Sequence, residues 1–366
     1  MGITRFEPKD ADEADEVAAW WRERFGEVWL EPERNAWLYE RNPCLGDDGP
    51  GPWLCRRKGA IVGQQGEVPF DLQLGPDVHR ASWAVDLEVD EGWRLKGVGP
   101  ALIATLLEAR PIVCSLDLSD EGYAAFKGAG AFDLGTVGVY RRPLDPRRVV
   151  RMAGIPAIVQ RFAPVVAPLA RMLDGVLAAS VRLRGAKLVP IDRFDERVDD
   201  VWDAAHPHYG ALARRDLAAL AWRIDERADR DKLLRYYLVR RGRTLGYAVL
   251  RPSVSSDERT VVVVDYLAPP RWVAPLLLLA GRAARRDHGA VALSVKTRNL
   301  QADRSLKLAG FVNRRMGHDH DRRFMVNSLE EGERAVPAEV VARLHDADGW
   351  FVTGTDSNLE FAAAPS

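Results

Sequence analysis

The sequence has few cysteines, no long apolar run and almost no net charge. Its 366 residues include three cysteines, Cys44, Cys55 and Cys114, which are too few and too scattered for a disulfide framework or a zinc site and indicate a reducing compartment. No stretch reaches the ~18 uninterrupted apolar residues of a membrane span, and the first residues lack the apolar core of a signal peptide. A formal net charge of −1 gives no overall field that would attract nucleic acid or acidic lipid. These absences predict a cytoplasmic protein that does not bind nucleic acid and has no metal centre.

A short glycine loop is the most informative feature that the sequence does contain. Residues 83–89 alternate as in a β-strand, residues 101–109 have the apolar pattern of a helix, and Arg94-Leu95-Lys96-Gly97-Val98-Gly99-Pro100-Ala101 joins them. Glycines let a backbone approach a ligand, and the free N–H groups and dipole of a helix N-terminus favour an anion. The third glycine of a dinucleotide-binding loop is missing, and the acidic residues precede the loop instead of following it by ~20 residues. The pattern therefore predicts a pyrophosphate site of another kind.

The loop, read as R-x-x-G-x-G-[PA], resembles the acyl-CoA pyrophosphate loop of the GNAT N-acetyltransferase superfamily. The resemblance implies that acetyl-CoA or another short acyl-CoA is the co-substrate, and that its pantetheine arm pairs with the backbone of the strand before the loop. It implies contacts with residues on both sides of the loop: Leu87, Glu88, Val89, Arg94, Leu95, Lys96, Gly97, Val98, Gly99, Pro100 and Ala101.

The two halves of the sequence repeat one pattern, which identifies an internal duplication. Two of the matches share an offset of 183 residues, and a third has an offset of 180. The matched pairs are Tyr39 with Trp222, Gly63 with Gly246, and 119–130 with 299–310. The second member of the last pair, Asn299-x-x-Ala302-x-x-x-Leu306-x-x-x-Gly310-Phe311, resembles the GNAT element that follows the fifth strand.

We therefore expect an α/β protein with a mixed sheet, in which two GNAT-like acyltransferase folds lie in tandem, joined by a helical linker. The expected boundaries are a first domain at 1–143, a basic linker at 144–187, a degenerate second domain at 188–328 and a tail at 329–366 with a short strand at 350–353. In the first domain we expect strands at 2–6, 52–57, 60–68, 81–89, 111–117 and 132–141, and helices at 11–24, 33–41, 99–109 and 120–128.

The linker is rich in arginine and apolar residues, and prolines at 156, 164 and 168 divide it into short segments. It could lie on anionic lipid as a basic amphipathic arm. It could instead pack across the two domains with its arginines in water. The prolines prevent one long amphipathic face, so we favour the second interpretation over contact with a membrane.

The resemblance implies direct transfer of the acyl group to an acceptor, so the protein must orient the reactants and accept a proton. Asp86 is our first candidate for the base, because some GNAT enzymes hold a carboxylate on this strand, and Glu67 is the second. These carboxylates could instead form ion pairs with Arg80 or Arg94. The position of the family's proton-donating tyrosine holds Phe126, so Tyr123 is the remaining candidate for the acid.

The second half lacks the phosphate loop. After its expected fourth strand, 260–266, two prolines (Pro269 and Pro270) stand where an anion would need N–H donors, so we expect it to shape the acceptor cleft or to stabilise the first half. The histidine pairs at 206/208 and 318/320 have no third ligand at a suitable spacing.

The sequence thus predicts a GNAT-type acyltransferase that acylates an amine of a small molecule or amino-sugar. One alternative is a non-catalytic protein that binds CoA or serves as a scaffold, which the missing tyrosine favours. A second is an aminoacyl transferase resembling the Fem family, against which the near-neutral charge and the intact loop argue.

Overall fold

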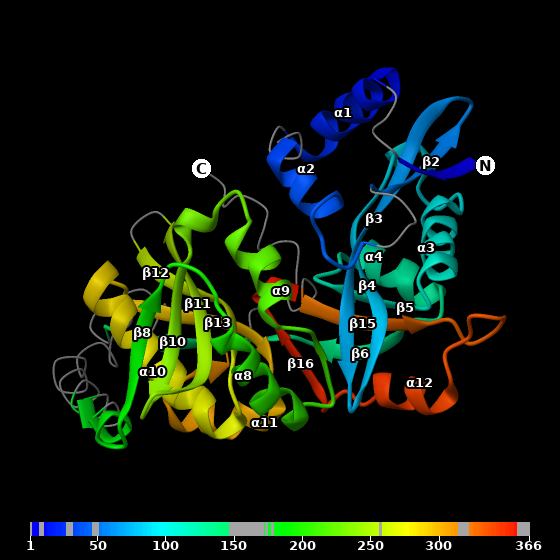
Figure 1. Cartoon of the computed structure of the whole chain (residues 1–366). Helices are drawn as coiled ribbons and strands as arrows, with labels where there is room; N and C mark the ends of the chain where they lie inside the picture. The colour runs from blue at the N-terminus through cyan, green and yellow to red at the C-terminus, as the bar shows by residue number, and fades with distance from the viewer. Residues whose placement is uncertain are drawn as a thin grey trace, which may run out of the picture.

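The computed structural model describes residues 2–6, 11–26, 32–45, 51–145, 172, 175–176, 179–255, 258–313 and 322–356. Most of the linker and the second histidine pair, 318/320, lie outside these residues. Two α/β units lie side by side, and their strands form one continuous mixed sheet (Figure 1). Among the described residues, no helix is both long and apolar enough to cross a bilayer.

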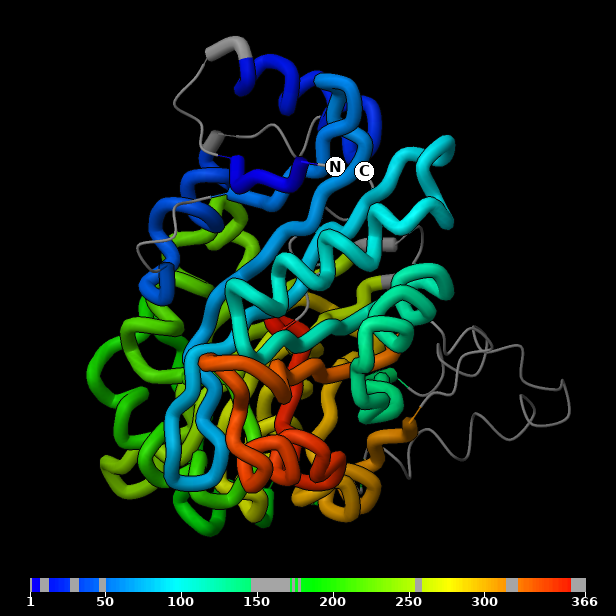
Figure 2. The backbone as a smooth tube through the Cα atoms, turned by 90° about the vertical axis from the view of Figure 1, so that its right-hand side faces the viewer, coloured from blue at the N-terminus to red at the C-terminus, as the bar shows by residue number. Residues whose placement is uncertain are grey.

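The first unit is a twisted sheet in which all neighbouring strands run antiparallel except β4 and β5, which are parallel. In spatial order its strands are β1 (Gly2–Arg5), β2 (Trp53–Arg57), β3 (Ala60–Leu74), β4 (Asp77–Val89), β5 (Ile112–Leu116), β15 (Arg323–Ser328) and β6 (Phe132–Thr136). The hairpin of β3 and β4 runs the length of this unit (Figure 2). Its turn meets α12 (Ala338–Leu344), where Arg343 Nη1 lies 3.0 Å from Asp77 Oδ2.

Helices cover both faces of the first sheet because the side chains of its strands alternate between the faces. Leu54 and Ile61 pack against α1 (Ala11–Phe25) on one face. Cys55 and Val62 pack against α3 (Val98–Ala109) on the other. The remaining helices of this unit are α2 (Pro32–Tyr39) and α4 (Asp120–Gly128), the latter capped by the Ser119 hydroxyl, which accepts the Gly122 N–H at 3.1 Å. The elements expected in this half are confirmed, with small differences at their ends. β3 and β4 are longer than expected, and the expected strand at 132–141 is divided into β6 and a second strand that begins at Gly138.

The second unit repeats this plan. In spatial order its strands are β8 (Ala186–Ile191), β10 (Leu234–Arg240), β11 (Arg243–Ser255), β12 (Glu258–Leu267), β13 (Ala292–Arg298), β7 (Gly138–Pro143) and β14 (Val312–Asn313). Its helices are α8 (Arg197–Ala205), α9 (Leu217–Leu220), α10 (Pro270–His288) and α11 (Leu300–Leu308). Only β12 and β13 are parallel among these neighbours, as β4 and β5 are in the first unit.

The two units exchange strands. β7 follows the first unit in sequence but pairs with β13 of the second, and β15 follows the second unit but pairs with β5 of the first. Each sheet is therefore completed by the other half of the chain. This exchange was not expected from the sequence, and the domain boundaries given above stay a prediction.

A small junction joins the sheets edge to edge. β9 (Ala211–Ala213) pairs with the far end of β3 and with β16 (Trp350–Thr353), and β16 also pairs with β13. The strand expected at 350–353 is confirmed. Above the junction the rings of Trp37 and Trp222 stack with centroids 5.2 Å apart. Each indole donates to the other residue's carbonyl, at 2.7 and 2.9 Å. This reciprocal contact is what a two-fold relation between the repeats requires. In this contact Trp37 is the counterpart of Trp222, whereas the sequence comparison had paired Trp222 with Tyr39.

Candidate functional site

The end of β4 forms an open strand edge. β4 and β5 pair only from Ser82–Ala84 to Val113–Ser115, although β4 continues to Val89. Opposite Gln65 of β3 the register shifts, which places a bulge in β4 at Asp86 and Leu87; bulges bend a strand and redirect its side chains. Within the described residues no strand pairs with the β5 side of this last stretch. Its backbone can therefore hydrogen-bond an extended ligand, as expected for a pantetheine arm.

The glycine loop leads directly into α3. Gly97 is the N-cap residue with φ +82°, and a Cβ at this position would meet no atom within 4 Å. Glycine is therefore favoured here by the left-handed backbone conformation and not by a lack of space. No side chain caps the helix. Because Pro100 has no N–H, the N–H groups of Val98 and Gly99 are the donors of the first turn that have no acceptor within the helix. Both groups are available to a phosphate at the positive end of the helix dipole.

Two cations extend this loop. The Arg94 guanidinium contacts the Val89 carbonyl at 3.1 Å and Glu88 Oε1 at 3.2 Å. Lys96 Nζ donates to the Gly92 carbonyl at 2.6 Å. Arg94 and Lys96 are exposed, and both can turn towards an anion in exchange for these contacts.

An aromatic and a basic residue beside the loop were not predicted from the sequence. Trp93 lies between two cations, with Lys96 Nζ 5.4 Å and the Arg57 guanidinium carbon 5.7 Å from its ring. Arg57 comes from the β2–β3 hairpin, 37 residues earlier in the chain than Arg94. The basic pair Arg57-Lys58 before Gly59 was the available sequence signal, but only the hairpin places it at the loop.

Asp86 has a buried side chain, 5% exposed, and its backbone has φ +57°. Its Oδ2 lies 4.0 Å from Arg34 Nη2 on α2; the partners considered from sequence were Arg80 and Arg94. Tyr39, on the same helix, is buried close by, and burial together with the negative charge of Asp86 raises the pKa of its hydroxyl. The bulge therefore turns a carboxylate to the α2 face of the sheet.

Glu67 has a different environment from the one expected of a base. Its carboxylate is 1% exposed and is contacted by Arg5 Nη2 at 2.6 Å and Arg110 Nε at 2.9 Å. The Ser82 hydroxyl donates to Oε2 at 2.9 Å. Two guanidinium groups and a hydroxyl occupy this carboxylate, which ties β1, β3 and the end of α3 together and leaves it poorly placed to accept a proton from a substrate.

Tyr123 lies on α4 with its hydroxyl bound to Asp133 Oδ2 at 2.8 Å, and Arg323 lies over its ring at 4.1 Å. These contacts hold it between α4, β6 and β15. Phe126 is 1% exposed in the core beneath α3, and Leu306, its counterpart in the second unit, is fully buried. Neither position can donate a proton.

The second unit differs from the first where its parallel strands part. β12 and β13 pair from Thr260–Val263 to Ala292–Val295, and beyond this point the segment 350–356 contacts both strands. The Thr353 hydroxyl donates to Asp265 Oδ1 at 2.7 Å, and Arg215 bridges Asp265 and Asp356 at 3.3 and 2.6 Å. In the second unit, β16 and the residues after it thus occupy the space between the diverging parallel strands. The equivalent space beside the end of β4 in the first unit has no strand within the described residues. That the second half does not bind CoA stays a prediction.

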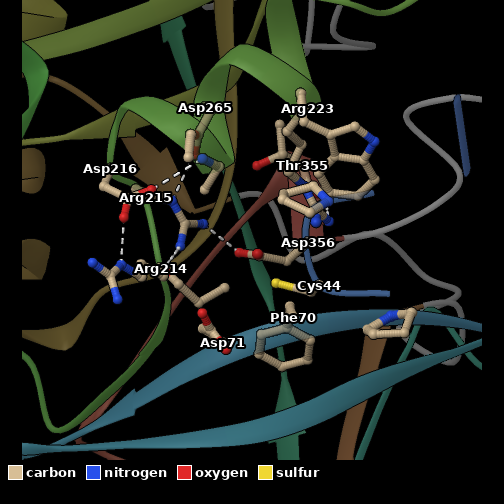
Figure 3. A pocket seen from close by; sticks show the side chains of 16 residues that line it. Cys44, Phe70, Asp71, Arg214, Arg215, Asp216, Arg223, Asp265, Thr355 and Asp356 are labelled. Atoms are coloured by element: carbon tan, nitrogen blue, oxygen red, sulfur yellow. Dashed lines mark hydrogen bonds and ion pairs between the residues drawn. The ribbon is translucent and has the colours of Figure 1, made fainter. Parts of the chain in front are cut away.

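A cavity of about 320 Å³ lies between the units, on the α2 side of β3 (Figure 3). Phe70 and Trp222 form apolar walls, while Asp71 and Asp216 are polar lining residues. Both carboxylates have arginine partners, at 3.0 and 2.5 Å. Burial raises the pKa of the Cys44 thiol, which also lines the cavity. The residues of the cavity come from segments that no sequence motif had connected.

The described residues contain no group of three or more histidine, cysteine, aspartate or glutamate side chains that could hold a metal ion. His206, at the C-terminal end of α8, instead contacts the Trp202 carbonyl through Nδ1 at 2.9 Å.

Solved structures of acyltransferases resemble this chain over most of its length. A GCN5-related N-acetyltransferase from Anabaena variabilis matches 89% of this chain and 73% of its own, with a TM-score of 0.56 and 12% identity. A conserved Enterococcus faecalis protein, described as a probable N-acyltransferase, matches 90% and 73%, with a TM-score of 0.58 and 11% identity. N-myristoyltransferase from Saccharomyces cerevisiae, solved with myristoyl-CoA, matches 89% and 78%, with a TM-score of 0.52 and 10% identity.

The chain has a tandem GNAT fold. No family model and no curated protein matches the sequence, so the fold is established by its structure alone. Within this fold, the first GNAT unit contains the glycine loop and the open edge of β4, and the second contains neither.

Proposed function

We propose that the chain is an acyl-CoA-dependent N-acyltransferase that transfers an acetyl or other short acyl group to an amine of a small molecule or amino-sugar. The observation that supports this most is the conjunction of two features in one unit. The bulged end of β4 is unpaired on its β5 side, and the short loop that follows it leads into a helix whose N-terminus is capped by a left-handed glycine. A strand edge for an amide-bearing arm and a helix N-terminus for a pyrophosphate are the two parts that an acyl-CoA needs.

The chemistry follows from the residues at the bulge. The acceptor nitrogen attacks the thioester carbonyl carbon, the nitrogen loses a proton to Asp86, and the carbon–sulfur bond breaks to release the thiolate. Because Phe126 and Leu306 cannot donate, the thiolate takes its proton from solvent or from Tyr123. Asp86 lies on the α2 side of the sheet, the side of the cavity between the units, from which we propose that the acceptor enters.

A non-catalytic CoA-binding role is the second candidate. It is favoured by the burial of Asp86 beside Arg34 and by the full engagement of Glu67. The two candidates share the CoA site and differ only in turnover, so one set of measurements can separate them.

The test is calorimetric titration with a panel of acyl-CoAs, followed by an assay of CoA release with amine acceptors. One CoA is expected per chain, and Gly97→Val should abolish its binding because a branched side chain occupies the space of the pyrophosphate. Gly130→Val is the matched control: Gly130 has φ +86°, and a Cβ there would also meet no atom within 4 Å, so the backbone strain is alike but the loop is intact. Two CoA sites of similar affinity, or equal loss in both variants, would contradict the proposal.

A further inference from the structure

A second concentration of positive charge lies on the second unit, away from the glycine loop. An open groove of about 650 Å³ is lined by seven residues, called here the arginine groove: Arg184, Arg240, Arg241, Arg243, Leu245, Arg271 and Trp272. It shares no residue with the cavity between the units. The groove is formed by the turn before β8, the β10–β11 hairpin and the start of α10.

No acidic residue lines the arginine groove, and none of its five arginines has an ion pair with a carboxylate in the part of the chain that the structure describes. Arg240 is the most constrained, since its Nε donates to the Arg184 carbonyl at 2.8 Å and its guanidinium lies 5.6 Å from the Trp272 ring. The other four arginines are exposed. Five guanidinium groups without a carboxylate repel one another, and an anion relieves that repulsion.

The groove repeats the surroundings of the glycine loop. Lys58 and Arg241 occupy the same place in their hairpins, both with positive φ (53° and 49°) and both followed by a glycine. In each unit the residue before them, Arg57 or Arg240, lies over a tryptophan beside the helix start. A basic hairpin, an aromatic ring and a helix N-terminus are thus brought together twice.

The donors differ between the two places. At α10 the N-cap and first residues are Pro269 and Pro270, which have no N–H, and the Trp272 N–H is bound to the Pro269 carbonyl at 2.8 Å. Backbone donors are therefore scarce, and arginine side chains supply the positive charge. Guanidinium groups bind phosphate oxygens through two parallel N–H bonds, which lysine cannot do.

We propose that the arginine groove binds an anion with two adjacent phosphates, at a site separate from that of acyl-CoA. The inference does not require the chain to be an acyltransferase, because the five arginines and the tryptophan of the groove all belong to the second unit or the turn before it.

The test is calorimetry with inorganic pyrophosphate on the Gly97→Val variant, whose glycine loop is blocked, because CoA itself carries two adjacent phosphates and would compete for the groove. Pyrophosphate should bind once per chain, more weakly as salt rises. Arg241→Ala/Arg243→Ala should weaken this binding about tenfold or more. Arg285→Ala, on the exposed C-terminal end of α10, should leave it unchanged. The arginine changes are made in the same Gly97→Val background, so that binding at the glycine loop does not contribute.

Vesicles distinguish the source of the phosphates. Sedimentation with vesicles that contain a lipid diphosphate, if it depends on Arg241 and Arg243 and is absent with zwitterionic vesicles, would identify lipid headgroups as the source. Pyrophosphate binding alone would identify a soluble diphosphate. The proposal is overturned if neither probe binds or if binding is the same in the double variant.

Discussion

At the scale of single residues, the role of Asp86 depends on its neighbour Arg34. A carboxylate that is 5% exposed and 4.0 Å from a guanidinium group can be a counter-ion, a base or both. The backbone argues for a site shaped around this residue, because φ +57° is a conformation in which Asp and Asn are tolerated far better than most other residues. The same preference makes Asn a replacement that preserves the bulge.

We expect Asp86→Asn to lower turnover by ~10²–10⁴-fold, the size of a general-base contribution, with little change in acyl-CoA affinity. Steady-state kinetics and calorimetry on the same preparation measure both quantities. Turnover within threefold of the unmodified protein would place the base elsewhere.

Two further variants separate catalysis from folding. Glu67→Gln breaks a buried pair with Arg5 and Arg110 and should cost about 3–5 kcal/mol of stability, with a turnover per folded molecule close to normal. Asp86→Asn/Arg34→Gln removes the buried charge of Arg34 as well. If Asp86 is only a counter-ion, this double variant recovers turnover along with stability; if it is the base, turnover stays low.

At the scale of elements, the exchanged strands make each unit depend on the other half of the chain. Three consecutive residues of β15, Phe324, Met325 and Val326, are at most 1% exposed. Met325 packs with Phe126 and with the inner face of α3. The strand that closes the first unit therefore lies more than 200 residues beyond its glycine loop.

We expect residues 1–145 expressed alone not to fold cooperatively, because the edge of β5 and the core beneath α3 lose their cover. Residues 179–356 should lose the matching cover of β13, and mixing the two fragments should restore cooperative unfolding and one CoA site. Circular dichroism during heating follows both steps. Cooperative unfolding of the first fragment by itself would show that the exchange is dispensable.

The order of elements could be predicted from sequence because their signals are local. Alternation identified the strand before the glycine loop, and the spacing of apolar residues identified the helix after it. The exchange could not be predicted, since β7 and β15 carry the same alternating pattern whichever sheet they join. The partners of Asp86 and Glu67 were missed for a related reason: Arg34, Arg5 and Arg110 lie on other elements, and only packing brings them to these carboxylates.

At the scale of the whole molecule, the core that joins the units contains tyrosines with little access to water. Burial raises the pKa of Tyr39, Tyr209 and Tyr247, and that of Tyr266 to about 12. In the unfolded chain these hydroxyls ionise near pH 10. A folded pKa above the unfolded one means that the native state holds its protons longer, so the stability it contributes is present in full below about pH 10 and is lost as the pH rises above it.

We therefore expect the free energy of unfolding to fall steeply above about pH 10, by about 1.4 kcal/mol per pH unit for each such tyrosine. Urea unfolding at a series of pH values measures the slope, and phenolate absorbance measures ionisation. The absorbance of the buried tyrosines should appear together with unfolding and not before it. Tyr209→Phe removes one titrating hydroxyl, which donates a hydrogen bond to the Ala268 carbonyl at 2.9 Å. The variant should be less stable at neutral pH, and its free energy of unfolding should fall less steeply with pH because one tyrosine fewer titrates. Full phenolate absorbance in a protein that still unfolds cooperatively would show that water reaches these hydroxyls in the native state.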